Sequence, residues 1–329
     1  MYIDNLTVEI TDKCNAGCPQ CMRTNPNGCI PNTFVRNIDI TFDNFKCYVP
    51  YTILKNIKKI SFNCPMGDPV AHANIFPILD YIVLHNPNIK IDFPTNGSLR
   101  NQDYWQRLAT YKQVTATFAI DGIHNSTHTH YRRNTNLSKI LNNATTYIKA
   151  GGNAVWQFII FEHNHTEEFQ AKQTSIDLGF SNFVSFHSSR FNNTDTFKYS
   201  YENINYELKM IDTDLKYRSK LHYGQRNHVN SIKCKSLDNK EIFIDIEGNI
   251  IPCCYHAGSL FANIHINKRD GFNNYIDVSF DNYNIEKFNI NTEGFESAFN
   301  SYEKYMEDLK VQWQQLNPPL CKVVCGKCD

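Results

Sequence analysis

Short apolar runs rich in β-branched residues alternate with amphipathic stretches from the N-terminus to about residue 190. This alternation is typical of βα units around a parallel sheet. The strands are expected at Leu6–Ile10, Ile57–Asn63, Ile89–Phe93, Val114–Ile120, Ala154–Phe161 and Phe183–Phe186. Helices are expected at Ile75–Leu84, Asp103–Tyr111, Leu137–Ala150 and Glu167–Leu178. Because right-handed crossovers make parallel strands curl, the predicted fold class is α/β, a partial (β/α)6 TIM-like barrel.

The pattern changes after residue 190. Residues 191–230 are polar and rich in Asn, Tyr and Lys, and they are expected to bridge two domains, with some helix around Tyr206–Lys216. Further on, Glu241–Ile246 and Ile250–Pro252 flank a turn-forming Glu-Gly-Asn set and predict a hairpin. A helix is expected from Glu296 to about Leu316, before two prolines. The predicted domains are therefore a core at 1–190, a bridge at 191–230 and a small α+β domain at 231–329.

Size and charge narrow the class of protein. A chain of 329 residues, 41% of them hydrophobic, can bury one large core and a smaller second one. Its 33 basic and 33 acidic residues cancel, so no global field attracts it to nucleic acid or to an anionic membrane. The N-terminal stretch MYIDNLTVEI lacks the basic and apolar regions of a signal peptide, and no apolar run approaches the roughly 20 residues of a bilayer span. We expect a cytoplasmic protein.

The cysteines form two groups. Of twelve, three lie between Cys14 and Cys21 and six between Cys234 and Cys328. Disulfides do not persist in a reducing cytosol, so grouped cysteines in a cytoplasmic protein indicate metal binding.

The first group, Cys14-x3-Cys18-x2-Cys21, follows the first predicted strand, where a βα fold places its chemistry. Three thiolates within one loop suit a cubane iron–sulfur cluster and leave its fourth iron free for a small molecule. A structural zinc ion takes four protein ligands, and the nearest further cysteine is Cys29. The alternatives are a zinc knuckle or three unpaired buried thiols.

The segment EITDKCNAGCPQC, which contains these cysteines, resembles the motif of radical S-adenosylmethionine (SAM) enzymes. In that superfamily three cysteines hold a [4Fe–4S] cluster, and the amino and carboxylate groups of SAM bind the fourth iron. Similar motifs follow the next three strands. They are Gly67-Asp68-Pro69, which is like the family's Gly-Glu-Pro segment, Thr95-Asn96-Gly97, and Asp121-Gly122.

The resemblance implies SAM contacts for four residues. Backbone groups of the Gly67-Asp68 segment would hold the SAM amine, so Asp in place of Glu is tolerable, and Asn96 lies in the loop beside SAM. Asp121 would accept the two ribose hydroxyls. Arg190, just past the sixth predicted strand, is a further candidate, because its guanidinium can pair with the SAM carboxylate. Taken singly, the Asn-Gly and Asp-Gly pairs are also ordinary turns, and Arg190 suits a surface salt bridge equally well. Gln20 departs from the family, which often has an aromatic residue there, and this leaves the packing of adenine open.

The second group reads Cys234-x13-Gly248-x4-Cys253, followed by Cys321-x3-Cys325-x2-Cys328. It resembles the auxiliary-cluster extension called SPASM, or its shorter form called twitch. Six cysteines are too few for two fully ligated clusters, so the resemblance implies one auxiliary [4Fe–4S] cluster. Its ligands would be Cys234, Cys253 and two of Cys321, Cys325 and Cys328. A four-cysteine zinc site is the alternative. Cys254 is expected on the opposite strand face from Cys253.

Three histidines, at 124, 128 and 130, lie close together in the sequence HNSTHTH. They suit either a metal site or a solvated loop, with residues 131–133 anchoring the next helix. The loop is favoured because no acidic or cysteine partner stands at ligand spacing.

The resemblance implies a radical SAM oxidoreductase. Such an enzyme cleaves SAM reductively to a 5′-deoxyadenosyl radical, which abstracts hydrogen from a peptide or a small molecule. The auxiliary cluster would take up an electron, giving net oxidation or crosslinking, or it would bind or orient the substrate. Flavodoxin or ferredoxin would be the electron donor to the first cluster. Two other hypotheses are a zinc-stabilised module that binds nucleic acid or protein without catalysis, and a radical SAM fold that has lost turnover.

Overall fold

The chain divides into two units in the computed structural model, which describes residues 3–63, 65–188, 190–191, 194–211, 231–254, 256–257, 285–313, 321 and 325–327. Unit 1 comprises Met1–Ile10, Ile40–Pro65 and His222–Asp329, and unit 2 comprises Thr11–Asp39 and Met66–Leu221. The domain boundaries expected at residues 190 and 230 stay a prediction. None of the described helices combines the length and the apolar character that a bilayer span needs.

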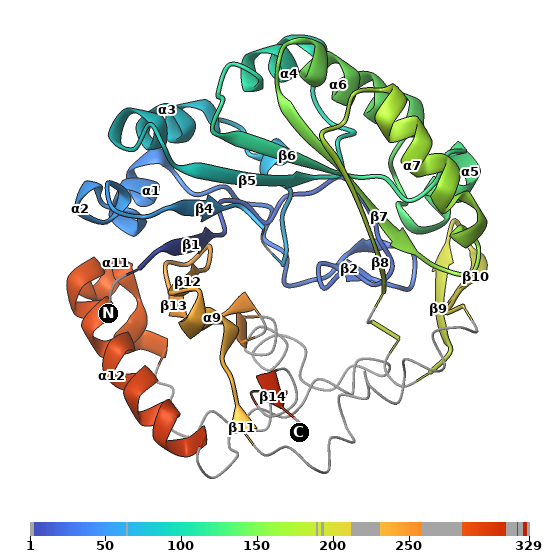
Figure 1. Cartoon of the computed structure of the whole chain (residues 1–329). Helices are drawn as coiled ribbons and strands as arrows, with labels where there is room; N and C mark the ends of the chain where they lie inside the picture. The colour runs from blue at the N-terminus through green and yellow to red at the C-terminus, as the bar shows by residue number, and fades with distance from the viewer. Residues whose placement is uncertain are drawn as a thin grey trace. The chain divides into compact units, whose positions relative to one another are not determined.

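Unit 2 contains four parallel strands and the helices that alternate with them along the chain. The strands, in spatial order, are β5 (Lys90–Thr95), β6 (Val114–Ala119), β7 (Asn153–Ile160) and β8 (Asn182–His187). The helices are α3 (Phe76–His85), α4 (Gln102–Leu108), α5 (Asn125–Tyr131), α6 (Leu137–Lys149) and α7 (Glu168–Asp177). Helices α4, α6 and α7 lie along one face of these strands (Figure 1).

An aromatic core joins these helices to the strands. Every second residue of β6 is buried, and one of them, Phe118, packs 5.1 Å from Trp105 of α4 between ring centroids. Trp156 of β7 lies 5.2 Å from Phe180 in the same way. Rings of this size remove much apolar surface from water, so their burial stabilises the arrangement. The loops that follow the carboxyl ends of β5 and β6 contain the site residues described below.

Unit 1 contains the strand at which the chain begins. Its strands run in the order β13 (Ile250–Ile251), β12 (Glu241–Ile244), β1 (Asn5–Val8) and β4 (Lys59–Ser61). Strand β1 is parallel to β4 and to β12, whereas β12 and β13 form an antiparallel hairpin. A short pair joins β11 (Ser231–Ile232) to β14 (Gly326–Lys327). The helices are α1 (Phe42–Tyr48), α2 (Tyr51–Leu54), α9 (Lys235–Asp238), α11 (Ile290–Glu293) and α12 (Phe295–Trp313).

The predicted fold class, α/β with a partial barrel, is confirmed. Each unit contributes four strands to this class of fold: those of unit 2 are parallel throughout, those of unit 1 are parallel except for the β12–β13 pair, and no closed barrel forms among the described strands. All six strands expected before residue 190 are present with ends shifted by at most two residues. The hairpin at β12 and β13 is also confirmed, and its turn places Gly248 at φ +84°, a conformation that favours glycine. Helix α12 begins one residue before the predicted start, and the predicted end near residue 316 lies outside the described residues.

The helix expected around Tyr206–Lys216 is wrong for its described part. Residues 204–209 form β10 (Ile204–Lys209), which pairs antiparallel with β9 (Thr196–Tyr201). The turn between them places Glu202 and Asn203 at φ +49° and +63°. Tyr199 and Leu208 of this hairpin are buried against the cysteine loop, and that packing outweighs the helix propensity of the segment. Residues 212–216 lie outside the described part.

The solvated loop expected at the three histidines is also wrong. The residues form α5, and His128 is fully buried, where its Nδ1 accepts a hydrogen bond of 3.1 Å from the backbone N–H of Asp121. Burial lowers the pKa of His128 to about 3, so the ring is neutral. Helix formation is favoured because it buries His128 and Tyr131 together.

Candidate functional site

The first cysteine group lies in one loop of unit 2, directly after the chain leaves β1. Cys18 is buried in an apolar cluster, and Cys14 and Cys21 pack against the same cluster, whose other buried members are Ala16, Cys29, Tyr131, Phe161, Phe191, Tyr199 and Leu208. A turn closes the loop, because the N–H of Cys21 donates to the carbonyl of Cys18 over 3.0 Å. The structure therefore brings the three predicted thiols together.

The electrostatic setting of these thiols suits ligands of a cluster. Burial, followed by the charge of Asp68, raises the pKa of Cys14 far above its ordinary value. Burial also raises the pKa of Cys18, although the nearby charge of Arg132 opposes that rise. Buried thiols stay protonated unless a metal binds them as thiolates, and soft sulfur ligands select iron–sulfur clusters, copper(I) or zinc.

Gln20 anchors the cysteine loop to the end of β8. Its side chain accepts a 2.7 Å hydrogen bond from Ser188 Oγ and donates one of 2.9 Å to the carbonyl of Arg190. In return, Arg190 Nη1 donates to the Gln20 carbonyl over 3.0 Å. The residue that departs from the family motif thus has a structural role, and the guanidinium of Arg190 lies at the cysteine loop. The contact of Arg190 with SAM stays a prediction.

The Gly67-Asp68 segment packs directly on the start of the cysteine loop. A Cβ atom at Gly67 would lie 1.8 Å from the carbonyl oxygen of Thr11, so only glycine fits there. The next N–H, of Asp68, donates to the carbonyl of Lys13 over 2.9 Å. The backbone of the Gly67-Asp68 segment is therefore in direct contact with the backbone at the start of the cysteine loop, as the motif register predicts.

The carboxylate of Asp68 connects its own loop to the loop after β5. It is 4% exposed and accepts hydrogen bonds from Val70 N at 3.0 Å, Thr95 Oγ1 at 3.1 Å, and both Asn96 N and Asn96 Nδ2 at 2.7 Å. Asn96 Nδ2 also points at Cys14 Sγ over 3.5 Å. The sequence indicated a backbone role only. The signal for this second role is a short acidic side chain directly before a proline, which is typical of a residue that caps a turn.

Asp121 is fully buried at the end of β6. Its Oδ1 accepts from the N–H of Ile159 at 2.7 Å, and its Oδ2 accepts from Arg132 Nε at 2.6 Å. Arg132 Nη1 in turn lies 3.7 Å from Cys18 Sγ. The sequence did not single out Arg132 for the site, because only the fold brings it to the cysteine loop.

The β9–β10 hairpin covers the cysteine loop and is fixed there by Arg133. The guanidinium donates to Tyr199 Oη over 2.6 Å and lies 4.1 Å above the ring centre of Tyr206 and 4.8 Å above that of Tyr201. The carbonyl of Arg133 accepts from the N–H of Gly17, inside the cysteine loop, over 2.9 Å. One arginine therefore ties the hairpin to the loop and helps to keep water from the thiols.

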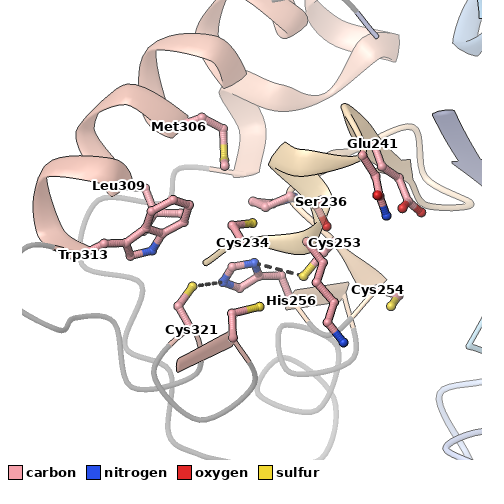
Figure 2. A pocket seen from close by; sticks show the side chains of 14 residues that line it. Cys234, Ser236, Glu241, Cys253, Cys254, His256, Met306, Leu309, Trp313 and Cys321 are labelled. Atoms are coloured by element: carbon pink, nitrogen blue, oxygen red, sulfur yellow. Dashed lines mark hydrogen bonds between the residues drawn. The ribbon is translucent and has the colours of Figure 1, made fainter. Parts of the chain in front are cut away.

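The second cysteine group meets in a cavity of about 200 Å³ in unit 1 (Figure 2). Its lining includes four of the five predicted ligands, namely Cys234, Cys253, Cys321 and Cys325. Cys328 lies outside the described residues. The pairing of β11 with β14 brings Cys325 to Cys234, and the hydrogen bond between these thiols, followed by burial, raises the pKa of Cys234.

His256, which the sequence reasoning missed, lies between two of these thiols. Its Nδ1 is 3.5 Å from Cys253 Sγ and its Nε2 is 3.9 Å from Cys321 Sγ (Figure 2). Burial lowers the pKa of His256 to about 4. The signal for His256 that was available in the sequence is a histidine three residues after Cys253.

The prediction that Cys253 and Cys254 lie on opposite faces of a strand is wrong. Strand β13 ends at Ile251, so both cysteines follow the strand, and Cys254 is exposed.

The arrangement of ligands differs from that of a single-ion site. In the part of the chain that the structure describes, no three His, Cys, Asp or Glu side chains converge closely enough to hold one metal ion. A cubane binds each thiolate through a different iron atom, so its ligands stand further apart. Sets of three or four thiols around an apolar site fit such a cluster.

Comparison with known proteins gives a family and a fold. Residues 8–171 match the model of the Radical SAM superfamily. The structure is similar to SuiB of Streptococcus suis bound to the precursor peptide SuiA, with a TM-score of 0.54 and 14% identity over 82% of this chain and 62% of SuiB. It is also similar to anSMEcpe with bound AdoMet, with a TM-score of 0.50 and 15% identity over 76% of this chain and 74% of anSMEcpe. Curated protein sequences give no significant match. At these identities the two structures show a shared fold.

Proposed function

Because this chain belongs to the radical SAM superfamily of enzymes, we propose that it cleaves SAM at a [4Fe–4S] cluster held by Cys14, Cys18 and Cys21. When bound, this cluster supplies the electron that splits SAM into methionine and a 5′-deoxyadenosyl radical, which takes a hydrogen atom from the substrate. The observation that carries the proposal is the convergence of three thiols in one loop, with Cys18 buried and Cys14 and Cys21 packed against the same apolar cluster, and with the Gly67-Asp68 segment in contact with the start of that loop. The superfamily membership decides against a zinc module without catalysis.

The chain's own residues would bind and orient SAM around that loop. Gly67 and Asp68 would present backbone groups to the SAM amine. The loop that contains Asn96 is joined to this segment by two hydrogen bonds from Asn96 to Asp68. Each carboxylate oxygen of Asp121 accepts one protein hydrogen bond and has further acceptor capacity for ribose hydroxyls. Arg190, held at the carbonyl of Gln20, would meet the SAM carboxylate.

The proposed substrate is a peptide, and a small molecule is the alternative. SuiB has been observed with a precursor peptide and anSMEcpe with the Cp18Cys peptide, and both share this fold. We place an auxiliary [4Fe–4S] cluster in the cavity of unit 1, with Cys234 and Cys253 and two of Cys321, Cys325 and Cys328 as ligands. The presence of the first two and of Cys321 and Cys325 in one cavity supports this ligand set. Its task would be to accept an electron from the substrate radical, which gives net oxidation or crosslinking. Flavodoxin or ferredoxin is the proposed donor to the first cluster.

Metal analysis and SAM cleavage test the proposal together. Protein reconstituted without oxygen should hold about eight irons and eight sulfides per chain if two clusters are present, and about four of each if only one is. Dithionite and SAM should then yield 5′-deoxyadenosine. Cys14→Ala should abolish that product, whereas Cys29→Ala, which removes a buried cysteine of the same apolar cluster, should leave it unchanged.

Each outcome separates one hypothesis from the others. Zinc in place of iron at the first site, or loss of cleavage in Cys29→Ala equal to that in Cys14→Ala, contradicts the proposed ligand set. Clusters without 5′-deoxyadenosine indicate a fold that has lost turnover. Cys234→Ala should lower iron from about eight to about four per chain while SAM binding persists. Retention of all iron in that variant refutes the auxiliary site.

A further inference from the structure

Arg132 places a positive charge at one of the proposed cluster ligands. Its Nη1 lies 3.7 Å from Cys18 Sγ, within reach of a hydrogen bond to sulfur. Its side chain is 13% exposed, and that of its partner Asp121 is 0% exposed, so bulk water screens the pair little. Charge-assisted hydrogen bonds to a thiolate are stronger than neutral ones.

A closed set of hydrogen bonds holds Arg132 in this position. Asp121 binds its Nε at 2.6 Å and is itself fixed by the N–H of Ile159. The N–H of Asp121 donates to His128, whose Nε2 lies 3.1 Å from Thr135 Oγ1. Thr135 Oγ1 donates back to the carbonyl of Arg132 over 2.6 Å. The guanidinium therefore has little freedom to turn away from Cys18.

The charge on Arg132 persists in this setting. An arginine guanidinium stays protonated in proteins, and here Asp121 Oδ2 pairs with Arg132 Nε at 2.6 Å. The potential of an iron–sulfur cluster depends on nearby charge and on hydrogen bonds to its sulfurs. A cation beside a ligand sulfur stabilises the state that carries one more electron.

We propose that Arg132 raises the reduction potential of the SAM-binding cluster through its hydrogen bond to Cys18, and that Asp121 positions it and limits the effect as its counter-ion. This inference rests on the proposed function, because it needs the cluster on Cys14, Cys18 and Cys21. It assigns Arg132 a positioning role, since the residue acts through a ligand.

An EPR-monitored redox titration with dithionite tests the inference on the reconstituted full-length protein without SAM, so that SAM binding does not contribute. The variant Cys234→Ala is the background, because it leaves only the first cluster to titrate. On that background, Arg132→Gln should make reduction at least tenfold less favourable, a shift of about 59 mV to lower potential for one electron. Asp121→Asn should shift the potential in the opposite direction, because the cation then lacks its counter-ion. Arg132→Lys, which keeps the charge without the planar fork, should fall between wild type and Arg132→Gln.

Arg107→Gln is the matched control. This arginine is exposed on α4 and lies 3.9 Å over the ring of Phe76, so its loss should leave the potential unchanged. Equal potentials in the wild type and Arg132→Gln overturn the inference, and a shift of Asp121→Asn to lower potential refutes the counter-ion role of Asp121. If Arg132→Gln takes up no cluster, Arg132→Lys decides: a potential below that of the wild type supports the inference, and an equal potential overturns it. Absence of a cluster from the background protein itself would instead refute the proposed function.

Discussion

Truncation of Asp68 to alanine removes an acceptor that serves four donors from two loops. Asn96 Nδ2 keeps a partner in Asn15 Oδ1 at 3.0 Å, but the N–H groups of Val70 and Asn96 and the hydroxyl of Thr95 lose theirs. Each orphaned buried donor costs about 1–3 kcal/mol, and removal of a buried carboxylate returns part of this sum. We expect Asp68→Ala to lower the free energy of unfolding by about 3–5 kcal/mol.

The magnitude can be checked by thermal denaturation of the reconstituted protein. At about 2–4 °C per kcal/mol, the midpoint should fall by roughly 6–20 °C. Asp68→Asn keeps the shape but turns an amide donor toward one of the four donors, so it should cost only about 1–3 kcal/mol. SAM should bind Asp68→Ala at least tenfold more weakly in calorimetry, because the displaced loops carry the proposed SAM contacts.

A surface variant provides the control. Asp103 lies in the first turn of α4 and is exposed, so Asp103→Ala should cost less than about 1 kcal/mol and leave SAM affinity as in the wild type. If Asp68→Ala melts within 1 °C of Asp103→Ala and binds SAM normally, the hydrogen bonds of Asp68 do not hold the two loops together.

The remaining predictions concern three other residues. Gly67→Ala should weaken SAM binding at least tenfold in calorimetry, because its Cβ would lie 1.8 Å from a carbonyl of the cysteine loop; normal binding would contradict the close approach. Burial lowers the pKa of His128 to about 3 from 6.5, so the unfolded chain binds more protons between these values and stability falls as the pH drops through this range. Urea unfolding at pH 7 and pH 5 measures how far the free energy of unfolding falls between these two pH values. This fall should be about 2 kcal/mol smaller in His128→Asn than in the wild type, and an equal fall would refute burial of a neutral ring. Arg133→Met should speed the decay of iron–sulfur absorbance in air severalfold, whereas Lys198→Met, exposed on the same hairpin, should not.

The strands of the barrel could be predicted from sequence because their burial repeats along the chain. Residues 114, 116 and 118 of β6 are buried and those between them are half-buried, so the pattern in the sequence reflects the sheet directly. Burial does not alternate in this way along the β9–β10 hairpin, its turn, Glu202-Asn203, contains no glycine, and β10 contains good helix formers. Its conformation is decided by contacts of Tyr199 and Leu208 with the distant cysteine loop, which local propensity does not include.

Some residues of the candidate site can be identified from their position in the sequence, and others only from the folded structure. Cys14, Cys234, Cys253, Asn96 and Asp121 come shortly after strands, so their positions along the chain indicate their place in the fold. Arg132 lies 114 positions from Cys18 in sequence, and His256 lies 65 positions from Cys321. Residues of this kind act through a partner that only the folded chain brings near, and no spacing in the sequence identifies them.

The parallel pairing of β1 with β12 constrains how the protein is made. Strand β1 has one neighbour in β4 and the other, β12, 236 positions downstream, as the pairing of Asn5 with Glu241 shows. At about 5–20 residues per second, a ribosome needs roughly 12–50 s to synthesise the missing neighbour. During that interval one edge of β1 has no partner in the nascent chain. Removal of the C-terminal third would likewise leave the first strand with an open edge.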